Sequence, residues 1–249
     1  MISFFQKKRP LIKYYSNADL RQKVWMNQML PTPMSENVPN WFRKLKADAS
    51  TGSLKTCPSF INMMKTGFVI KTPSEITVEG IVENGRVEAE IKPTAPKEIA
   101  ILETHDHEQF SADFPFHQRH INMALKFTNP FRCRTSEPVD VLFLPCWWDV
   151  NNENVTAFHG MFRLPSDRDI PLNVNCAFRM PNAGEKYVVP YGTPIAHIIF
   201  VEQASVQFKH DPSLRDDDQA NWSIAQVGLV QAQGSMRKFA ENMKRFLVK

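Results

Sequence analysis

The chain has 249 residues, of which 43% are hydrophobic, with 30 Lys and Arg against 26 Asp and Glu. This composition supports a real core and excludes wholesale disorder, and the nearly balanced charge excludes the strongly basic field of a dedicated nucleic-acid binder. Eighteen Pro against nine Gly, with short apolar runs between them, favour β structure with ordered loops. No apolar run approaches the roughly 18 residues that a membrane-spanning helix needs.

Residues 1–64 are predicted to form an N-terminal arm and short helices that pack on a sheet. Val38–Leu45 reads as a short helix with a Trp–Phe pair, and Pro58 suits the first turn of another helix. Thr66-Gly67 is a stop signal, and the apolar run Phe68–Ile70 follows directly. We therefore expect the second helix to lie against the sheet and to cover one end of it.

Residues 65–210 are predicted to form a β domain that is jelly-roll or barrel-like, within a mainly β (α+β) fold. The strongest local signal is Asn84-Gly85, a two-residue turn between two alternating runs in Glu75–Lys92. We expect one face of this hairpin to see solvent. Further strands are expected at Ala124–Thr128, Val139–Leu144, Val155–Leu164 and Leu172–Arg179.

The stretch Lys186–Glu202 is the one around which the β domain is organised. It reads as two β segments joined by the corner Pro190–Pro194, in which Gly192 supplies freedom in φ. The run from Ile195 onward is almost entirely apolar, which predicts a strand buried on both faces. His197 lies inside this run, so we expect a buried, neutral imidazole that needs a hydrogen-bond partner.

Residues 211–249 are predicted to form a charged loop and a C-terminal amphipathic helix. Its apolar residues recur at spacings of three and four: Met236, Phe239, Met243 and Phe246. With the N-terminal helices, this helix would flank the β domain in one structural unit.

The four cysteines are far apart and form no CxxC pair. We expect reduced, mostly buried thiols in an intracellular protein.

His105–His120 holds four of the seven histidines. His105 and His107 alternate as residues on one face of a strand do, which suits two ligands of one metal. Asp113, Glu108 or His197 could complete a set for Fe or Zn. The alternative interpretation is a polar, exposed loop whose histidines form hydrogen bonds, with no cofactor.

A second candidate site is an aromatic and basic platform for a ligand, made of Trp147 and Trp148 with Arg132 and Arg134. Indole rings stack on ligands, and guanidinium groups bind anions. The alternative is ordinary packing at the edge of a sheet. The sequence contains no nucleophile elbow and no glycine-rich phosphate loop.

Four segments occur along the chain in the order VPNWFRKL (38–45), LKTCPSF (54–60), KTGFVI (65–70) and PYGTPIAH (190–197). This order resembles a family of proteins of similar length from tailed bacteriophages, many of them marine. The resemblance implies a viral gene product in the cytoplasm of the infected host cell or in the virion, and it carries no activity with it.

A shorter resemblance rests on Phe158–Phe162 and Gly192–Phe200. These segments are similar to the last two motifs of the dUTPase family, which builds a small β barrel around a nucleotide. The resemblance implies β architecture. His159, in the first of the two segments, is a further candidate for ligand binding.

No complete catalytic constellation appears in the sequence. We therefore expect a phage-encoded binding or assembly protein without catalytic activity, which contacts a protein partner or another copy of itself rather than a membrane or nucleic acid. A small-molecule ligand is a further option. The alternative is an enzyme on a β scaffold, either metal-dependent through His105 and His107, cupin-like or of the non-haem iron type, or nucleotide-acting and dUTPase-like.

Overall fold

The computed structural model describes residues 11–16, 29–47, 52–95, 101–105, 121, 124–149, 153–201 and 207–210, which lie in the unit Met1–Asp211. The second unit, Pro212–Lys249, includes almost all of the predicted charged loop and the C-terminal helix, and it lies outside the described residues. The candidate metal ligands His107 and Asp113 also lie outside them. No helix among the described residues is long and apolar enough to cross a membrane.

The described residues are mainly β structure, as the sequence predicts, in four sheets that are antiparallel apart from the β1–β16 pair. One four-stranded sheet has the order β12 (Ile170–Pro171), β8 (Arg132–Thr135), β1 (Leu11–Tyr15), β16 (Gln207–His210). The other has the order β10 (Val155–Ala157), β13 (Val174–Phe178), β7 (Leu125–Phe127), β6 (Leu102–Thr104). The five-stranded sheet has the order β11 (Gly160–Leu164), β9 (Val139–Pro145), β15 (Pro194–Phe200), β3 (Phe68–Lys71), β2 (Thr32–Pro33). The three-stranded sheet has the order β14 (Lys186–Val189), β4 (Ile76–Glu83), β5 (Arg86–Pro93).

These sheets do not close into a barrel within the described ranges. One predicted strand, Val155–Leu164, is in fact two strands in different sheets, β10 and β11. The chain leaves the first sheet at Phe158, whose N–H donates to Asn175 O at 2.8 Å, and enters the second at Gly160. The sequence pattern does not reveal this change of sheet, because side chains alternate with a period of two in both strands.

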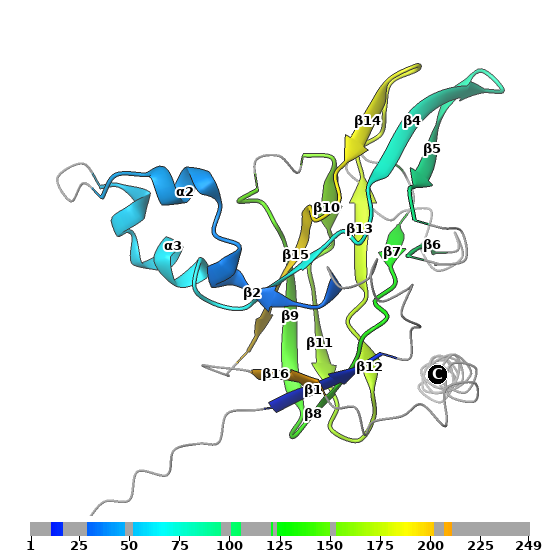
Figure 1. Cartoon of the computed structure of the whole chain (residues 1–249). Helices are drawn as coiled ribbons and strands as arrows, with labels where there is room; N and C mark the ends of the chain where they lie inside the picture. Colours follow the sequence, from blue (N-terminus) through cyan, green and yellow to red (C-terminus); the bar gives the residue numbers. More distant parts are fainter. Residues whose placement is uncertain are drawn as a thin grey trace, which may run out of the picture. The chain divides into compact units, whose positions relative to one another are not determined.

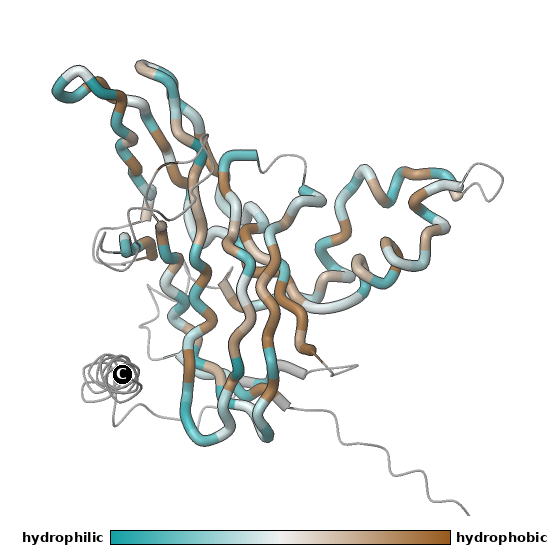
Figure 2. The backbone as a smooth tube through the Cα atoms, turned by 180° about the vertical axis from the view of Figure 1, so that it is seen from behind, coloured by the Kyte–Doolittle hydropathy of each residue, from teal (hydrophilic) through white to brown (hydrophobic). Residues whose placement is uncertain are grey.

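The central strand of the five-stranded sheet is β15, and it forms the middle of the main core. It pairs with β3 on one side and β9 on the other. Ile195, Ala196 and Ile198 are each fully buried, so consecutive residues, which point to opposite faces, are both covered. Figure 2 shows mostly hydrophobic residues along the strands of this sheet. The prediction of a strand buried on both faces is confirmed.

His197 of β15 is buried and hydrogen-bonded, as expected. Its Nε2 lies 2.7 Å from the carbonyl oxygen of Thr66, and since a carbonyl only accepts, Nε2 carries the proton. Burial lowers the pKa of His197, although the hydrogen bond to Thr66 acts in the opposite direction. The ring also packs edge-on against Trp148, with centroids 6.5 Å apart. The imidazole is therefore a neutral link between β15 and the segment before β3.

The corner Pro190–Pro194 is held by Thr72, from the segment between β3 and β4. Its hydroxyl donates to Pro190 O at 2.8 Å and accepts from Thr193 N at 2.9 Å. Gly192 has φ +75°, as the sequence predicts, and its N–H donates to Thr72 O at 3.0 Å. The corner is thus fixed by polar contacts to a remote strand connection.

We expect Gly192→Val to destabilise the protein more than His197→Gln. A β-branched residue at φ +75° is strained by about 1–2 kcal/mol or more, although no atom lies within 4 Å of its Cβ position. Glutamine keeps an N–H donor for Thr66 O. Melting temperatures measured side by side test this, and His197→Leu, which leaves that carbonyl unpaired at a cost of about 1–3 kcal/mol, is the control. A His197→Gln protein that melts below Gly192→Val would contradict the prediction.

Two short helices, α2 (Asn40–Lys44) and α3 (Pro58–Met63), lie beside β2 with the 3-10 turns η2 (Met34–Glu36) and η3 (Leu54–Thr56) (Figure 1). They enclose a second apolar cluster that includes Phe42, Met64 and Trp148. The indole N–H of Trp41 donates to Trp148 O at 2.8 Å, which ties α2 to the end of β9. Helices therefore occur within the predicted segment 38–45 and from Pro58, and they share this cluster with Val69 of β3.

Gly67, between α3 and β3, lies in close contact with the central strand β15. It has φ +82°, and a Cβ at this position would lie 2.2 Å from the carbonyl oxygen of Ile198 and 3.1 Å from His197 Nε2. Glycine is therefore needed for both the backbone conformation and the close approach.

All four cysteines are free thiols, and three of them, Cys133, Cys146 and Cys176, are buried. Burial raises the pKa of each buried thiol, for Cys133 to about 12. Backbone N–H groups of Phe60 and Ser59 lower the pKa of Cys57, at the start of α3. The prediction of mostly buried, unpaired thiols is confirmed.

Candidate interaction surface

The three-stranded sheet β14–β4–β5, which we call the β-finger, extends away from the other sheets, with the β4–β5 turn at its outer end (Figure 1). Asn84 and Gly85 have φ 51° and 76°, so both central residues of the turn are left-handed, as a type I′ turn requires. The register of β4 and β5 is unbroken from Ile76–Pro93 to Glu83–Arg86. The hairpin prediction at Glu75–Lys92 is confirmed.

One face of the β-finger is apolar from the core to the tip. Ile76 and Val78 are fully buried, and Ala89 and Ile91 pack against the same cluster. Farther out on this face, Val82 and Val87 lie directly opposite each other, with 65% and 37% of their surface exposed. We call Val82 and Val87 the tip pair. The apolar face of the hairpin therefore continues beyond the protein's own core.

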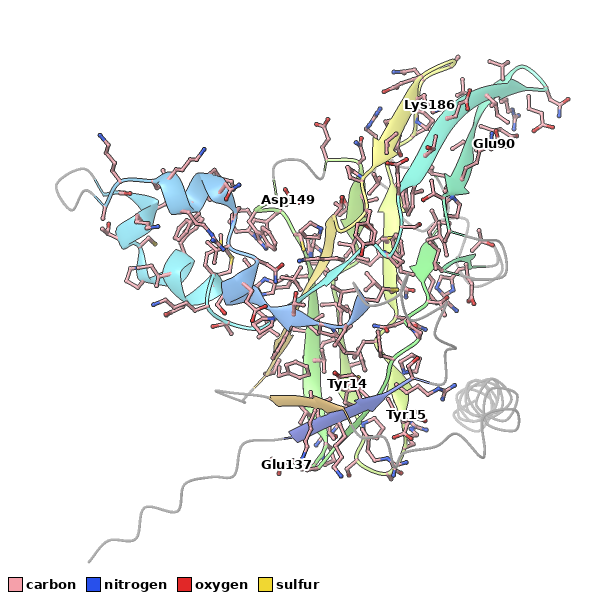
Figure 3. The ribbon with its side chains drawn as sticks, in the orientation of Figure 1. Tyr14, Tyr15, Glu90, Glu137, Asp149 and Lys186 are labelled. Atoms are coloured by element: carbon pink, nitrogen blue, oxygen red, sulfur yellow. The ribbon has the colours of Figure 1, made fainter. Side chains whose placement is uncertain are left out.

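The opposite face of the β-finger carries charges. Lys186, Glu79 and Glu90 lie side by side on β14, β4 and β5, in that order, and Figure 3 shows Lys186 and Glu90 near the outer part of the sheet. Glu79 and Glu90 are like charges on neighbouring strands, which is unfavourable. Lys92 partly compensates, with its Nζ 2.6 Å from Glu90 Oε2.

The outer part of the β-finger is held by the turn that contains Asn182 and Gly184, just before β14. Gly80 donates to Glu185 O and accepts from Gly184 N, both at 2.9 Å. A Cβ on Gly80 would lie 2.0 Å from the backbone oxygen of Asn182. The absence of a side chain at position 80 allows this turn to lie flat on β4.

Arg179 and Glu185 close the same turn with a charged network. Arg179 Nη2 lies 2.6 Å from Glu185 Oε1, and Asn182 N donates to Glu185 Oε2 at 2.8 Å. The guanidinium also lies 4.6 Å from the ring centroid of Tyr187, whose hydroxyl donates to Arg179 O at 2.6 Å. The hydrogen bond from Arg179, followed by that from Asn182, lowers the pKa of Glu185 to about 2.

This network predicts an acid-sensitive β-finger. The folded pKa of Glu185 lies below its usual value of 4.5, so the stabilisation is present above pH 4.5 and is lost as the pH falls toward about 2. In Glu185→Gln, we expect the melting temperature to fall less steeply than in the parent over that interval. Melting curves across the interval test this, with Glu137→Gln on the exposed turn before β9 as the control. Equal slopes for Glu185→Gln and the parent would contradict the assignment.

The four residues of the predicted aromatic and basic platform do not come together. Arg132 and Arg134 lie on β8, whereas Trp147 and Trp148 follow the far end of β9, a seven-residue strand that spans roughly 20 Å. Figure 3 shows Glu137 and Asp149, just outside the two ends of β9, well apart.

The platform residues also have separate surroundings. Arg134 makes a bidentate ion pair with Asp169, with contacts of 2.6 and 2.9 Å. Trp148 is buried, whereas Trp147 is exposed and contacts Phe60 edge-on with ring centroids 5.7 Å apart. One indole is buried and the other is exposed, so these two consecutive tryptophans do not form one surface.

His159 is exposed in the connection between β10 and β11. The two segments that resemble dUTPase motifs lie in the same sheet, since β11 and β15 both pair with β9, on its two sides. His159 itself lies outside both strands.

The histidine cluster is represented among the described residues by His105, just after β6. Its Nε2 lies 3.0 Å from Asn175 Oδ1, so that nitrogen is engaged in a hydrogen bond. Within the ranges that the structure describes, no three His, Cys, Asp or Glu side chains gather as a metal site would require.

The sequence contains a signal for the tip pair that the prediction of a half-exposed hairpin did not use. Alternation of apolar residues continues on both sides of Asn84-Gly85 up to the turn itself, although a hairpin end in water has no need of it.

Comparison of the chain with models of known protein families gives no match, and neither characterised proteins nor solved structures show significant similarity to it.

Proposed function

We propose that this protein is a bacteriophage-encoded binding or assembly protein without catalytic activity, and that the β-finger carries its protein contact. The observation on which this rests is the tip pair, Val82 and Val87, at the end of an apolar face that is continuous with the core. Apolar residues exposed on a well-held element are typical of surfaces that become buried on association. The phage origin rests on the order of the four sequence segments at 38–45, 54–60, 65–70 and 190–197.

Two finer features belong to the same proposal. The sheets would form a jelly-roll arrangement with flanking terminal helices, and the protein would act in the cytoplasm of the infected cell or in the virion. Stoichiometric iron or zinc in the purified protein would favour the alternative, an enzyme whose metal is bound through His105 and His107.

The proposal is tested by recovery of the full-length protein with its partner or in purified particles, from the cells in which it is naturally made. We expect Val82→Glu to reduce cross-linked partner, or the amount of protein in particles, by about tenfold. Met161→Glu is the matched control, because Met161 is 67% exposed, close to the 65% of Val82, but lies on β11. Both variants should melt like the parent, since neither residue is buried.

The comparison of the two variants decides the result. Equal recovery of the parent, Val82→Glu and Met161→Glu would show that the β-finger is not the contact. Loss only in Val82→Glu would support the proposal.

A further inference from the structure

We propose that the outer edge of β5 is a strand-addition site, which binds an extended segment of a partner protein with alternating apolar and charged residues. This inference rests on the proposed binding function and specifies the chemistry of the partner. It is carried by the hydrogen-bonding groups along β5 and by the order of its charges, not by the tip pair.

The backbone groups of alternate residues of β5 point away from β4. Gly80 makes both of its backbone bonds to the segment before β14, Gly184–Glu185, so the opposite residue, Ala89, forms no ladder bonds with it. At the base, Thr94 N donates to Glu75 O at 2.9 Å, which gives the same alternation. The N–H groups of Val87, Ala89 and Ile91 are therefore the ones directed to the outer edge.

This edge is open among the described residues, since β5 is the last strand of its sheet. Natural sheet edges are often protected by a bulge, an early proline or a charge that points inward. The β5 register has no bulge, its only proline is the terminal Pro93, and its charged residues lie on the face away from the core. An edge of this length with three free donors in a row is what strand addition requires.

The charges on β5 disfavour pairing with a second copy of the same chain along the whole strand. If two β5 strands paired antiparallel along their whole length, centred on Ala89, then Glu88 would face Glu90 of the other copy. Arg86 would likewise face Lys92, so every charged pair would be repulsive. A register centred on Glu90 would pair residues 87–93 and place Glu88 opposite Lys92 twice, but Glu90 would face Glu90 at its centre.

The favoured occupant is a strand with the complementary order of charges. It places basic residues opposite Glu88 and Glu90, and acidic residues opposite Arg86 and Lys92. Between them it places apolar residues beside Val87, Ala89 and Ile91, two of which already pack on the core. Because this order of charges is symmetric, it matches in either strand direction.

The test uses the full-length protein and four synthetic peptides. The first, Glu-Val-Lys-Val-Lys-Val-Glu, has the complementary charges, and the second, Lys-Val-Glu-Val-Glu-Val-Lys, has them reversed. We expect the first to bind at least about tenfold more tightly than the second, because like charges across a strand pair oppose association. The third and fourth are versions of the first peptide that carry N-methyl groups on the backbone nitrogens of the valines or of the lysines. If the peptide pairs antiparallel to β5, its valine amides face the edge and the valine-methylated version should not bind. If it pairs parallel, the lysine-methylated version should not bind.

Amide hydrogen exchange locates the peptide without any change to the protein. On addition of the first peptide, exchange at Val87, Ala89 and Ile91 should slow, whereas Glu88 and Glu90 should already be protected by β4. Protection confined to other residues would overturn the inference.

A charge reversal in the protein provides the complementary control. In Glu88→Lys/Glu90→Lys, each peptide makes two favourable and two unfavourable charge pairs with β5, so the preference for the first peptide should be lost. The variant also removes the like-charge contact between Glu79 and Glu90, so folding should not suffer. Ala89→Pro removes one edge-facing N–H that has no partner in β4 and should abolish binding of both peptides.

Three further results would overturn the inference: no binding of the first peptide to the parent at about 1 mM, equal binding of both charge orders to the parent, or a dimer of the parent that Ala89→Pro dissociates. In the first two cases, loss of partner in Val82→Glu would still support the proposed binding function through the tip pair. Peptide binding without any partner contact in cells would leave the edge site intact and contradict the function.

Discussion

Gly67→Ala is expected to be among the most destabilising single substitutions in this protein, by about 3 kcal/mol or more. The new methyl group would lie 2.2 Å from the Ile198 carbonyl, and alanine would also have to adopt φ +82°. Neither neighbour can retreat easily, because Ile198 is in the central strand of the buried sheet and Gly67 O accepts from Met34 N at 2.9 Å. Movement of either one would also strain the His197–Thr66 hydrogen bond.

Denaturant unfolding measures the effect, and Gly52→Ala is its matched control. Gly52 has φ +72°, but no atom lies within 4 Å of its Cβ position. That substitution should cost only the left-handed conformation, about 1–2 kcal/mol. Equal losses for the two variants would show that the close approach of Gly67 to β15 contributes nothing.

Gly80→Ala is the second large effect, and it should act on the β-finger. Its φ is ordinary, so the cost comes from the contact at 2.0 Å with the Asn182 oxygen, about 1–3 kcal/mol. The two backbone bonds of Gly80 to Glu185 and Gly184 hold the turn against β4, so relief of the contact breaks at least one of them. We expect faster hydrogen exchange in β14 and weaker closure of the Arg179–Glu185 network.

The control for Gly80→Ala is Gly160→Ala, because both glycines lie in strands and neither has a left-handed φ. Gly160 has no atom within 4 Å of its Cβ position, so this variant should stay within about 0.5 kcal/mol of the parent. A Gly80→Ala protein with unchanged exchange in β14 would contradict the described packing of the turn.

Local patterns were sufficient to predict the elements that depend on neighbours in sequence. The Asn84-Gly85 turn, the helix start at Pro58, the corner at Gly192 and the buried strand after it all follow from residue type and spacing. Each is determined by backbone preference or by a hydrophobic period, and both are readable along the chain.

Contacts between remote segments could not be predicted in the same way. The Thr72 hydroxyl donates to Pro190 O, and Gly80 lies in contact with the turn at Asn182. In each case the two partners are far apart in sequence, and no nearby residue indicates the contact. For the same reason Arg132 and Arg134 were grouped with Trp147 and Trp148, although one strand separates the pairs in space. The candidate surface was missed because exposure of Val82 and Val87 depends on where the core ends, which the alternation does not reveal.

The parallel pairing of β1 with β16 has a consequence for how the chain acquires its structure. Leu11 pairs with Gln207 and Tyr14 with His210, so the sheet that contains β1, β8 and β12 gains its last strand from residues made nearly two hundred positions later. Such distant partners raise the contact order and the entropy lost on loop closure. During synthesis, β1 can pair with β8 well before β16 leaves the ribosome, and until then one edge of β1 stays open. We therefore expect the pairing of β16 with β1 to be a late, slow step of folding. Nascent chains stalled before residue 207 should be the aggregation-prone species.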